Sequence, residues 1–396
     1  MISFNKTILH KDIQRFIDEN LNTNISELVL KGIPFPKDIQ QDILHQIESK
    51  SRSRKKLPTW FSTKNIYYPP KLNIEQTSSE TTAEYKSNLI FGQSLIDLTG
   101  GFGVDTYYFS KHFKQVIHCE LNQDLSKIVR HNALVLNTQN LTFYSENGLE
   151  VLKKLNQTFD WIYIDPSRRN DSKGKVFLLK DCLPNVPNHI DLLLNYSKNI
   201  MIKTSPLLDI SSGINELSNV KTIQCIAVNN EVKELLWILE ANYKGQISIN
   251  TVDIKNDEYK EFNFIYEKEK ATEVDYSLPL TYLYEPNSAI LKSGAFNTLS
   301  KQLDVLKIHK HSHLYTSREL VKFPGRRFKI ETVLPYNKKS YHKIIGLNQA
   351  NVTTRHFPET VAQIRNKLKI KEGGKNYLFF TTNLDNLKII IFCTKI

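Results

Sequence analysis

Short apolar runs alternate with amphipathic segments between residues 85 and 255. The apolar runs predict strands over 94–98, 115–119, 141–144, 161–164, 200–203 and 220–228. Apolar residues at three- and four-residue spacing predict helices between them, over 104–112, 124–136, 148–155 and 190–196. This alternation is typical of an α/β fold with a mainly parallel sheet, whose ligands lie at the carboxyl ends of the strands.

The end of this segment has two interpretations. Asn229-Asn230 could form the turn of a hairpin whose second strand is 232–239, which would make the last strand of the sheet antiparallel. Residues 232–239 could equally form a helix. A further strand is expected over 261–266. The charged stretch 268–275 is where we expect a domain boundary.

The flanking regions carry other patterns. Apolar spacing over 8–20, 25–30 and 36–49 predicts a helical N-terminal region, residues 1–84. Residues 276–325 fit a small α+β unit with a helix over 294–306. Residues 326–396 alternate strand and loop, with a helix over 360–368 and two strands around Leu384-Asp-Asn-Leu.

Acidic residues stand at the ends of several predicted strands. Asp97 ends the first strand, and glycines follow at 100, 101 and 103, where small residues let a ligand lie against the backbone. Glu120 ends the next strand about twenty residues on, where a ribose hydroxyl needs a carboxylate acceptor. Asp165-Pro166 ends a later strand. This series favours S-adenosylmethionine over NAD as the ligand.

These motifs resemble the class I S-adenosylmethionine-dependent methyltransferases. More narrowly, the chain is similar to a bacterial methyltransferase family with a C-terminal THUMP-like domain, over most of its length beyond about residue 56. The narrower resemblance rests on Gln76-Thr-Ser-Ser-Glu80, Asp165-Pro-Ser-Arg-Arg169, Tyr284-Glu-Pro-Asn-Ser288, Phe323-Pro-Gly-Arg-Arg327 and Asn351-Val-Thr-Thr-Arg-His-Phe-Pro358.

The resemblance implies a Rossmann-like methyltransferase domain over 85–268, preceded by a helical region that often closes over the cofactor in such enzymes. It also implies C-terminal α+β domains, ferredoxin-like over 276–325 and THUMP-like and RNA-binding over 326–396. The implied cofactor is S-adenosyl-L-methionine.

The resemblance further implies cofactor contacts at the glycine turn. Asp97 would order the turn, and Gly101 and Gly103 would let the methionine part approach the backbone. Thr99, which we also expect to contact the cofactor, stands where the usual pattern has a glycine.

Two further cofactor contacts are expected at the neighbouring strand ends. Glu120 would accept both ribose hydroxyls, unless it is only a solvated acid at the end of a strand. Asn147 follows the third strand and would accept the adenine amino group through its carbonyl oxygen, or cap the following helix instead.

Asp165 and Pro166 are the expected catalytic residues. Methyl transfer is an in-line displacement, so an enzyme must hold the nucleophile about 3 Å from the methyl carbon. The string resembles the Asp/Asn-Pro-Pro-aromatic motif of amino-group methyltransferases, where the side-chain oxygen and a backbone carbonyl accept hydrogen bonds from the target NH₂. Here Ser167 replaces the second proline and Arg168 the aromatic residue. Arg168 and Arg169 could grip a phosphate, stack on a base, or form a salt bridge within the domain.

Other basic residues are candidates for substrate contacts. Lys203 ends the strand at 200–203 and would line the substrate side, and Arg326 and Arg327 would contact RNA. No cysteine occupies the Asp165-Pro edge or 203–206, which argues against a covalent 5-methylcytosine mechanism. No Ser/His/Asp triad or metal-ligand cluster stands out.

Composition indicates an ordinary globular protein. The chain has 396 residues, 40% of them apolar, and a mean hydropathy of −0.38, enough for two or three domains with cores of their own. No apolar run could span a bilayer, and the N-terminus lacks the features of a signal peptide. The four cysteines form no CxxC pair. Cys119 and Cys225 lie within apolar, strand-like runs, so we expect buried thiols in a cytoplasmic protein.

The positive charge is unevenly placed. The 53 Lys and Arg exceed the 41 Asp and Glu by 12, and ten of the basic residues lie in 307–343 against only two acids. They are interleaved with Tyr315, Phe323, Phe328, Tyr336 and Tyr341, as a surface that binds phosphates and unpaired bases requires. Alternating histidines at 309, 311 and 313 would lie on a solvated or phosphate-facing strand. The alternative is that lysine simply covers every solvated face.

The sequence therefore predicts an S-adenosylmethionine-dependent RNA methyltransferase that modifies a purine nitrogen in tRNA or rRNA. One alternative is a methyltransferase with a protein or small-molecule acceptor. Another is a non-catalytic RNA-binding protein that retains the fold. No membrane partner is expected, and the oligomeric state is left open.

Overall fold

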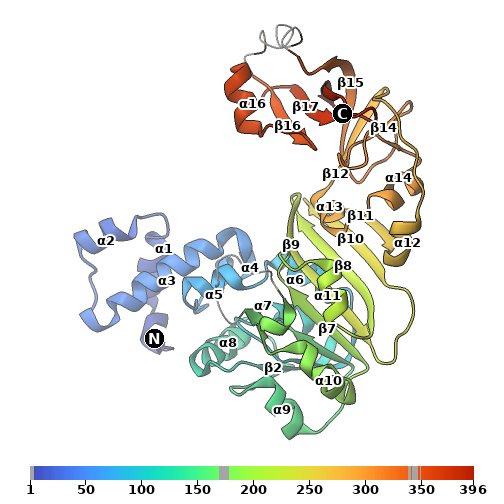
Figure 1. Ribbon diagram of the computed structural model, residues 1–396. Helices are drawn as coiled ribbons and strands as arrows, with labels where there is room; N and C mark the ends of the chain where they lie inside the picture. The colour runs from blue at the N-terminus through green and yellow to red at the C-terminus, as the bar shows by residue number, and fades with distance from the viewer. Residues whose placement is uncertain (1–3, 169–177, 338–339, 341–346, 348) are drawn as a thin grey trace. The chain divides into compact units, whose positions relative to one another are not determined.

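The computed structural model describes residues 4–168, 178–337, 340, 347 and 349–396, with only the backbone of Arg168 (Figure 1). The chain divides into two compact units. The first comprises Met1–Lys221 and Leu236–Lys244, and the second comprises Thr222–Leu235 and Gly245–Ile396.

The first unit begins with helices. They are η1 (Lys6–Leu9), α1 (Lys11–Glu19), α2 (Ile25–Lys31), α3 (Lys37–Lys56), α4 (Pro58–Ser62), α5 (Lys71–Gln76) and α6 (Glu80–Ser87) (Figure 1). Helix α3 continues through the basic stretch 51–56, because cations in a last turn interact favourably with the helix dipole. Buried residues of these helices form one core with residues of α7 and α8, which anchors the region to the sheet.

A parallel sheet forms the centre of the first unit. Its strands β1 (Gly92–Asp97), β2 (Phe113–Cys119), β3 (Leu141–Tyr144), β4 (Trp161–Ile164) and β7 (Asn199–Thr204) lie in the order β7-β4-β1-β2-β3. The C-terminal half of β9 (Glu231–Glu240) follows next to β7. Because the chain leaves β1 toward β2 and β3 and then crosses back to β4, a ligand crevice is expected at the carboxyl ends of β1 and β4.

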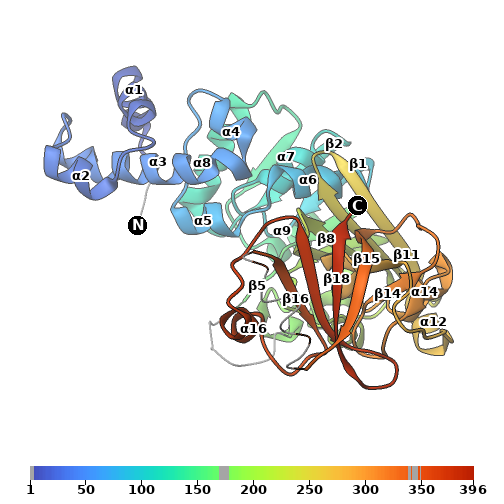
Figure 2. The same ribbon diagram turned by 90° about the horizontal axis from the view of Figure 1, so that it is seen from above.

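Helices and short segments connect these strands. They are α7 (Val104–Phe109), α8 (Gln123–Val135), α9 (Gly148–Leu155), β5 (Ser167–Arg168), η2 (Leu179–Asp181), β6 (Cys182–Leu183), η3 (Val186–His189), α10 (Ile190–Tyr196) and α11 (Ile210–Glu216) (Figures 1 and 2). All predicted strands and helices of this region exist, with bounds shifted by no more than three residues.

The second unit starts with a hairpin. Asn229 and Asn230, with φ of 52° and 63°, connect β8 (Val220–Val228) to β9, as a two-residue turn with positive φ does. The hairpin interpretation is therefore confirmed and the helical one is wrong. Strand β10 (Ser248–Lys255), which the sequence analysis did not identify, pairs parallel with β8 and antiparallel with β11 (Glu258–Ile265). The charged stretch after it begins as helix α12 (Tyr266–Ala271).

The remaining strands form a second sheet in the order β13-β14-β12-β15-β18-β17-β16. Its elements are β12 (Tyr282–Pro286), α13 (Ser288–Ser293), α14 (Asn297–Leu303), β13 (Leu306–Lys307), β14 (Tyr315–Ser317), β15 (Gly325–Pro335), β16 (Asn351–Arg355), α16 (Val361–Leu368), β17 (Asn376–Thr382) and β18 (Lys388–Lys395). Antiparallel pairing of β12 with β15 makes the two predicted C-terminal domains share this sheet. Alternating residues supply two cores, with Phe379 in one and Phe380 in the other.

Two expectations for the basic segment 307–343 are wrong, and so is the expected start of the helix that precedes it. Tyr315, Phe323 and Phe328 are buried core residues and cannot stack on bases. The alternating histidines lie in the turn between β13 and β14, not on a strand. The helix expected from 294 starts at Asn297, because Gly294 ends α13 in the left-handed conformation. Tyr341 lies outside the described residues.

Two further features concern the chain as a whole. All four cysteines are free and buried, which confirms the interpretation of Cys119 and Cys225 as buried thiols. Within the described residues, the helices are too short or too polar to cross a bilayer.

Candidate active site

Asp97 at the end of β1 organises the turn that follows it. Its carboxylate is 1% exposed and accepts hydrogen bonds from the Thr99 amide at 3.0 Å and the Thr106 hydroxyl at 2.7 Å. Burial raises the pKa of Asp97 to about 7, although both hydrogen bonds act in the opposite direction. The side chain therefore holds the turn against β1, although burial of its carboxyl group disfavours the charged form.

The glycines of this turn serve different purposes. Gly101 and Gly103 have φ of 54° and 75°, a region that favours glycine. A Cβ at Gly100 would collide with the buried His118 ring, and one at Gly103 would lie 2.5 Å from Val129 Cγ1. A Cβ at Gly101 would meet nothing closer than 3.8 Å, so the turn has open space on that side.

Glu120 faces the glycine turn. One carboxylate oxygen accepts the Gly101 amide at 3.0 Å and the other accepts the Asn122 amide at 2.7 Å. Burial raises the pKa of Glu120. The acid at the end of β2 is thus attached to the turn, beside its open side.

Asn147 caps helix α9. Its side-chain oxygen accepts the amides of Leu149 at 3.0 Å and Glu150 at 3.4 Å. An adenine amino group would have to share that oxygen. Gly148 lets the start of α9 approach Leu98, the residue after β1, because a Cβ there would collide with the Leu98 carbonyl oxygen.

Asp165 connects the end of β4 to both neighbouring strands. Its amide donates to the Thr99 hydroxyl at 2.6 Å, and its Oδ2 lies 2.5 Å from Lys203 Nζ on β7. The Asp165 side chain is 32% exposed and that of Lys203 is 12% exposed. Thr99, where the usual pattern has glycine, therefore supplies a hydroxyl that ties the turn to the Asp165-Pro166 edge.

A buried ionic cluster beneath this edge was missed by the sequence analysis. Lys86 on α6 is 0% exposed and lies 3.0 Å from Asp105 Oδ1. Ser78 at 2.9 Å and Tyr163 at 2.8 Å donate to the other oxygen of Asp105. Although burial raises the pKa of Asp105, Lys86 and Lys203 together hold it below its usual range. The cluster joins the helical region to the sheet through Ser78, which the Gln76–Glu80 string contains.

The other predicted site residues lie elsewhere or outside the described residues. The backbone of Arg168 pairs with Cys182, and Arg169 is not described. Arg326 and Arg327 lie on β15 in the second unit. Seven predicted residues therefore meet in the first unit: Asp97, Thr99, Gly101, Gly103, Glu120, Asp165 and Lys203. Asn147 stands at the start of α9, where the next residue, Gly148, approaches Leu98.

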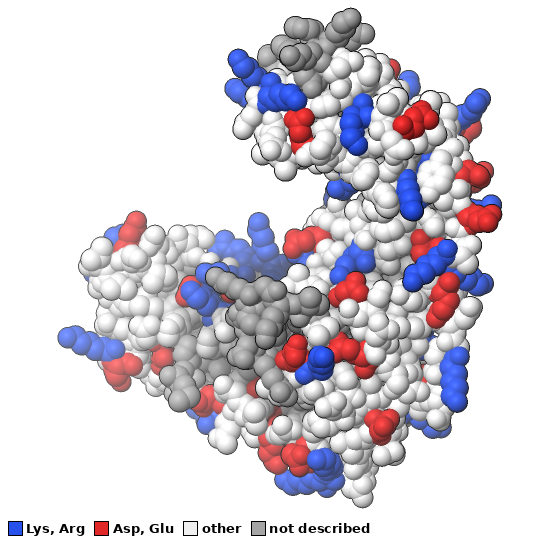
Figure 3. Space-filling model, in the orientation of Figure 1, with Lys and Arg blue, Asp and Glu red and all other residues white. Residues whose placement is uncertain are grey.

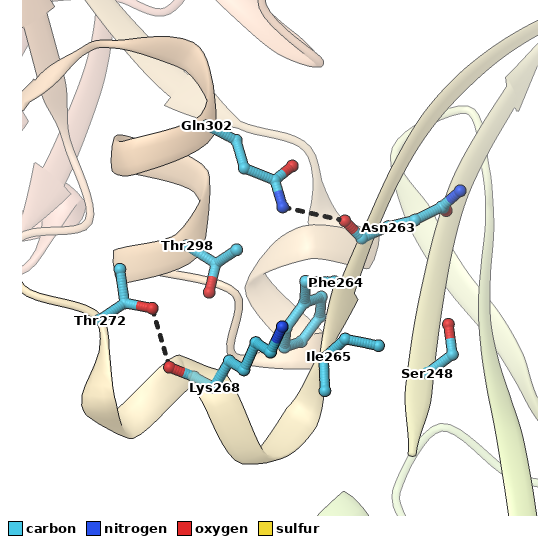
Figure 4. A pocket seen from close by; sticks show the side chains of 8 residues that line it. All are labelled: Ser248, Asn263, Phe264, Ile265, Lys268, Thr272, Thr298 and Gln302. Atoms are coloured by element: carbon cyan, nitrogen blue, oxygen red, sulfur yellow. Dashed lines mark hydrogen bonds between the residues drawn. The ribbon is translucent and has the colours of Figure 1, made fainter. Parts of the chain in front are cut away.

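A pocket of about 300 Å³ lies apart from all of these residues (Figure 4). Residues of β10, β11, α12, α14 and the segment after α12 line it: Ser248, Asn263, Phe264, Ile265, Lys268, Thr272, Thr298 and Gln302. It contains one charged side chain, Lys268, and none of the residues predicted to act in catalysis.

Comparison with known proteins identifies the C-terminal domains. Residues 282–324 match the profile of a ferredoxin-like domain, and residues 325–395 match that of a THUMP domain-like family. A crystal structure of a protein from Porphyromonas gingivalis W83, described as a "putative methyltransferase", superimposes over the full length of both chains with a TM-score of 0.90 and 29% sequence identity. The chain therefore carries ferredoxin-like and THUMP-like C-terminal domains and has the same overall fold as a structure described as a "putative methyltransferase". This confirms the resemblance and the fold class inferred from the sequence.

Other structural similarities are partial. A protein from Vibrio vulnificus YJ016, described as a modification subunit of a "putative type I restriction enzyme", matches 63% of this chain and 64% of that one, with 12% identity and a TM-score of 0.36. An rRNA methylase from Streptococcus thermophilus matches 40% of this chain and 93% of its own length, with 13% identity and a TM-score of 0.30. A comparison with proteins of curated function gave no match.

Proposed function

We propose that this protein is an S-adenosylmethionine-dependent methyltransferase that modifies a purine nitrogen of tRNA or rRNA. The observation that carries the proposal is the position of Asp165, bonded to the glycine turn through Thr99 and paired with Lys203. The full-length similarity to the Porphyromonas gingivalis protein supports the reaction class. The THUMP-like domain supports an RNA acceptor.

The residues at the glycine turn fit the cofactor. Gly101 leaves open space where a Cβ would otherwise stand, and the Glu120 carboxylate beside it matches two adjacent ribose hydroxyls. On binding, the Gly101 amide and the ribose hydroxyls would compete for the same carboxylate. When bound, S-adenosylmethionine supplies an electrophilic methyl group.

Asp165 would orient the acceptor amino group. Oδ2 is held by Lys203. Oδ1, to which no side chain of the described residues donates, would accept an N–H hydrogen bond, and the Pro166 carbonyl would accept the second one. These two bonds direct the nitrogen lone pair away from the carboxylate and toward the open side of the turn. The proton lost on N-methylation passes to Asp165 or to water.

An RNA acceptor also agrees with the charge of the chain. A net charge of +12 attracts a polyanion, and phosphate contacts supply much of the affinity of RNA-binding proteins. Lys and Arg side chains are intermixed with Asp and Glu over the face in Figure 3 and do not form one continuous basic patch there. Recognition would therefore depend on particular basic groups more than on total charge.

The test is transfer from methyl-labelled S-adenosylmethionine to total unmodified RNA separated by size. The comparison is between the wild type, Asp165→Ala and a surface control, Asp124→Ala, whose carboxylate pairs only with Lys127 in the described residues. We expect Asp165→Ala to lower transfer at least about 100-fold and to change the S-adenosylhomocysteine Kd less than about threefold. The control should match the wild type.

Other outcomes would favour the alternatives. Cofactor binding without label in any RNA fraction would indicate a protein or small-molecule acceptor. Absence of cofactor binding by the wild type would indicate a non-catalytic protein. Loss of both binding and transfer in Asp165→Ala would mean that this residue is structural.

A further inference from the structure

Three of the sequence strings that carry the family resemblance meet in the second unit. The string 284–288 supplies Glu285 on β12, the string 323–327 supplies Arg326 on β15, and the string 351–358 supplies Arg355 at the end of β16. Glu285 and Arg355 are 70 residues apart in sequence, and β15, β18 and β17 separate their strands in the sheet. Their contact therefore requires a strongly coiled sheet.

These side chains lie at the margin of one core. Glu285 shares a face of the sheet with Leu283, two residues before it, and Arg326 shares that face with Phe328. Leu283 and Phe328 belong to the same buried cluster. Arg355 reaches this face from the edge strand, so that two guanidinium groups approach one carboxylate from different strands.

Glu285 holds both arginines with its two oxygens. Its side chain is 3% exposed, and it accepts Arg326 Nε at 2.6 Å and Arg355 Nη2 at 2.7 Å. Two guanidinium charges against one carboxylate leave one net positive charge. The buried carboxylate thus fixes the position of two cations without neutralising both.

The arginines retain donors for another ligand. Their side chains are 38% and 35% exposed, and a guanidinium offers five N–H donors. Arg355 Nη1 donates to the Thr354 carbonyl oxygen at 3.5 Å, which is a long hydrogen bond. Planar guanidinium groups held in place match the oxygen atoms of a phosphate group.

A group of histidines adjoins Arg355. His356 follows it with a left-handed φ of 49°, and its ring stacks on His309 at 4.6 Å and 13°. His311 lies 5.3 Å from the His356 ring, and both side chains are exposed. Desolvation and the neighbouring basic groups lower the pKa of His356, so its imidazole is neutral near pH 7. Neutral aromatic rings of this kind can stack on unpaired bases.

We propose that Arg326 and Arg355, held by Glu285, bind a backbone phosphate of RNA whose adjacent unpaired base stacks on His356. The inference rests on the proposed function, because it assumes an RNA substrate. It assigns RNA docking to this site on the shared C-terminal sheet. The contrasting possibility is an ion pair that only joins β16 to β12.

The test measures binding of the full chain to a short unstructured oligoribonucleotide at several KCl concentrations. The variants are Arg326→Gln, Arg355→Gln and a matched control, Arg365→Gln. Arg365 lies on α16 in the same domain and pairs with the exposed Glu372 at 3.0 Å. We expect each site variant to weaken binding about tenfold and to reduce the salt slope by about one, whereas the control changes neither.

Stability and methyl transfer to RNA are measured on the same proteins. If Arg355→Gln does not fold, Arg355→Lys keeps a cation beside Glu285 and should bind RNA more weakly than the wild type, because lysine lacks the planar fork.

Site variants that match Arg365→Gln in RNA affinity and salt slope would overturn the inference. Methyl transfer by the wild type would in that case still support the proposed function. RNA binding through the arginines without transfer would support the site and contradict the proposed function. A wild type that does neither would overturn both.

Discussion

At the residue scale, the buried carboxyl group of Asp97 couples the site to pH. Its pKa of about 7 in the folded protein lies above its ordinary 3.8, so the folded state holds the proton more tightly than the unfolded chain. The stability that protonation contributes is fully present below about pH 4 and is lost as the pH rises through about 7.

Replacing Asp97 by asparagine should remove this dependence. We expect the free energy of unfolding of the wild type, relative to Asp97→Asn, to fall by roughly 2 kcal/mol between pH 5 and pH 8. Urea denaturation of both proteins across that range measures the difference, and groups common to both, such as His118, cancel. Parallel stability curves would show that the Asp97 carboxyl group does not titrate in this window.

At the scale of single elements, the start of α9 decides between two roles of Asn147. The structure shows the helix cap, and the loss of such a cap costs about 1 kcal/mol. Asn147→Ala should therefore lower the free energy of unfolding by about 1 kcal/mol and change the S-adenosylhomocysteine Kd less than about threefold.

Asn147→Ser is the matched control, since serine also caps helices and lacks the amide group. It should retain stability and cofactor affinity. A loss of affinity of more than about tenfold in both variants would instead assign Asn147 to the adenine ring, at about 1.4 kcal/mol for each factor of ten. Calorimetric titration and denaturation of the same samples distinguish the two roles.

At the scale of the whole molecule, the two proposed ligands depend differently on salt. RNA binding by a chain of net charge +12 would release counterions, whereas the proposed cofactor site at Asp97 and Glu120 would take a small ligand of low charge. Raising KCl from about 50 to about 200 mM should weaken RNA binding at least about tenfold and leave S-adenosylmethionine binding within about twofold. Filter binding and calorimetry measure the two affinities, and an RNA affinity that does not depend on salt would contradict a phosphate-based interface.

The sequence by itself determined the elements and the strand-end motifs. The spacing of apolar residues and the turn residues Asn229-Asn230 act over a few neighbouring residues, and they predicted the parallel sheet and the hairpin. The motifs at the strand ends, together with the family resemblance, predicted the seven site residues that meet. Strand β10 was not predicted because its alternation of apolar and polar residues is interrupted, with four consecutive buried positions.

Only the tertiary structure decided which charged and aromatic groups are buried and which partners they have. Asp165 and Thr99 are 66 residues apart, and Glu285 and Arg355 are 70 apart, so no local pattern could pair them. Lys86 is one lysine among many, and only the packing of α6 against α7 buries it beside Asp105. Likewise, Tyr315 and Phe328 stand among basic residues in the sequence but are buried, because strand pairing places them on opposite faces of a sheet that is covered at both positions.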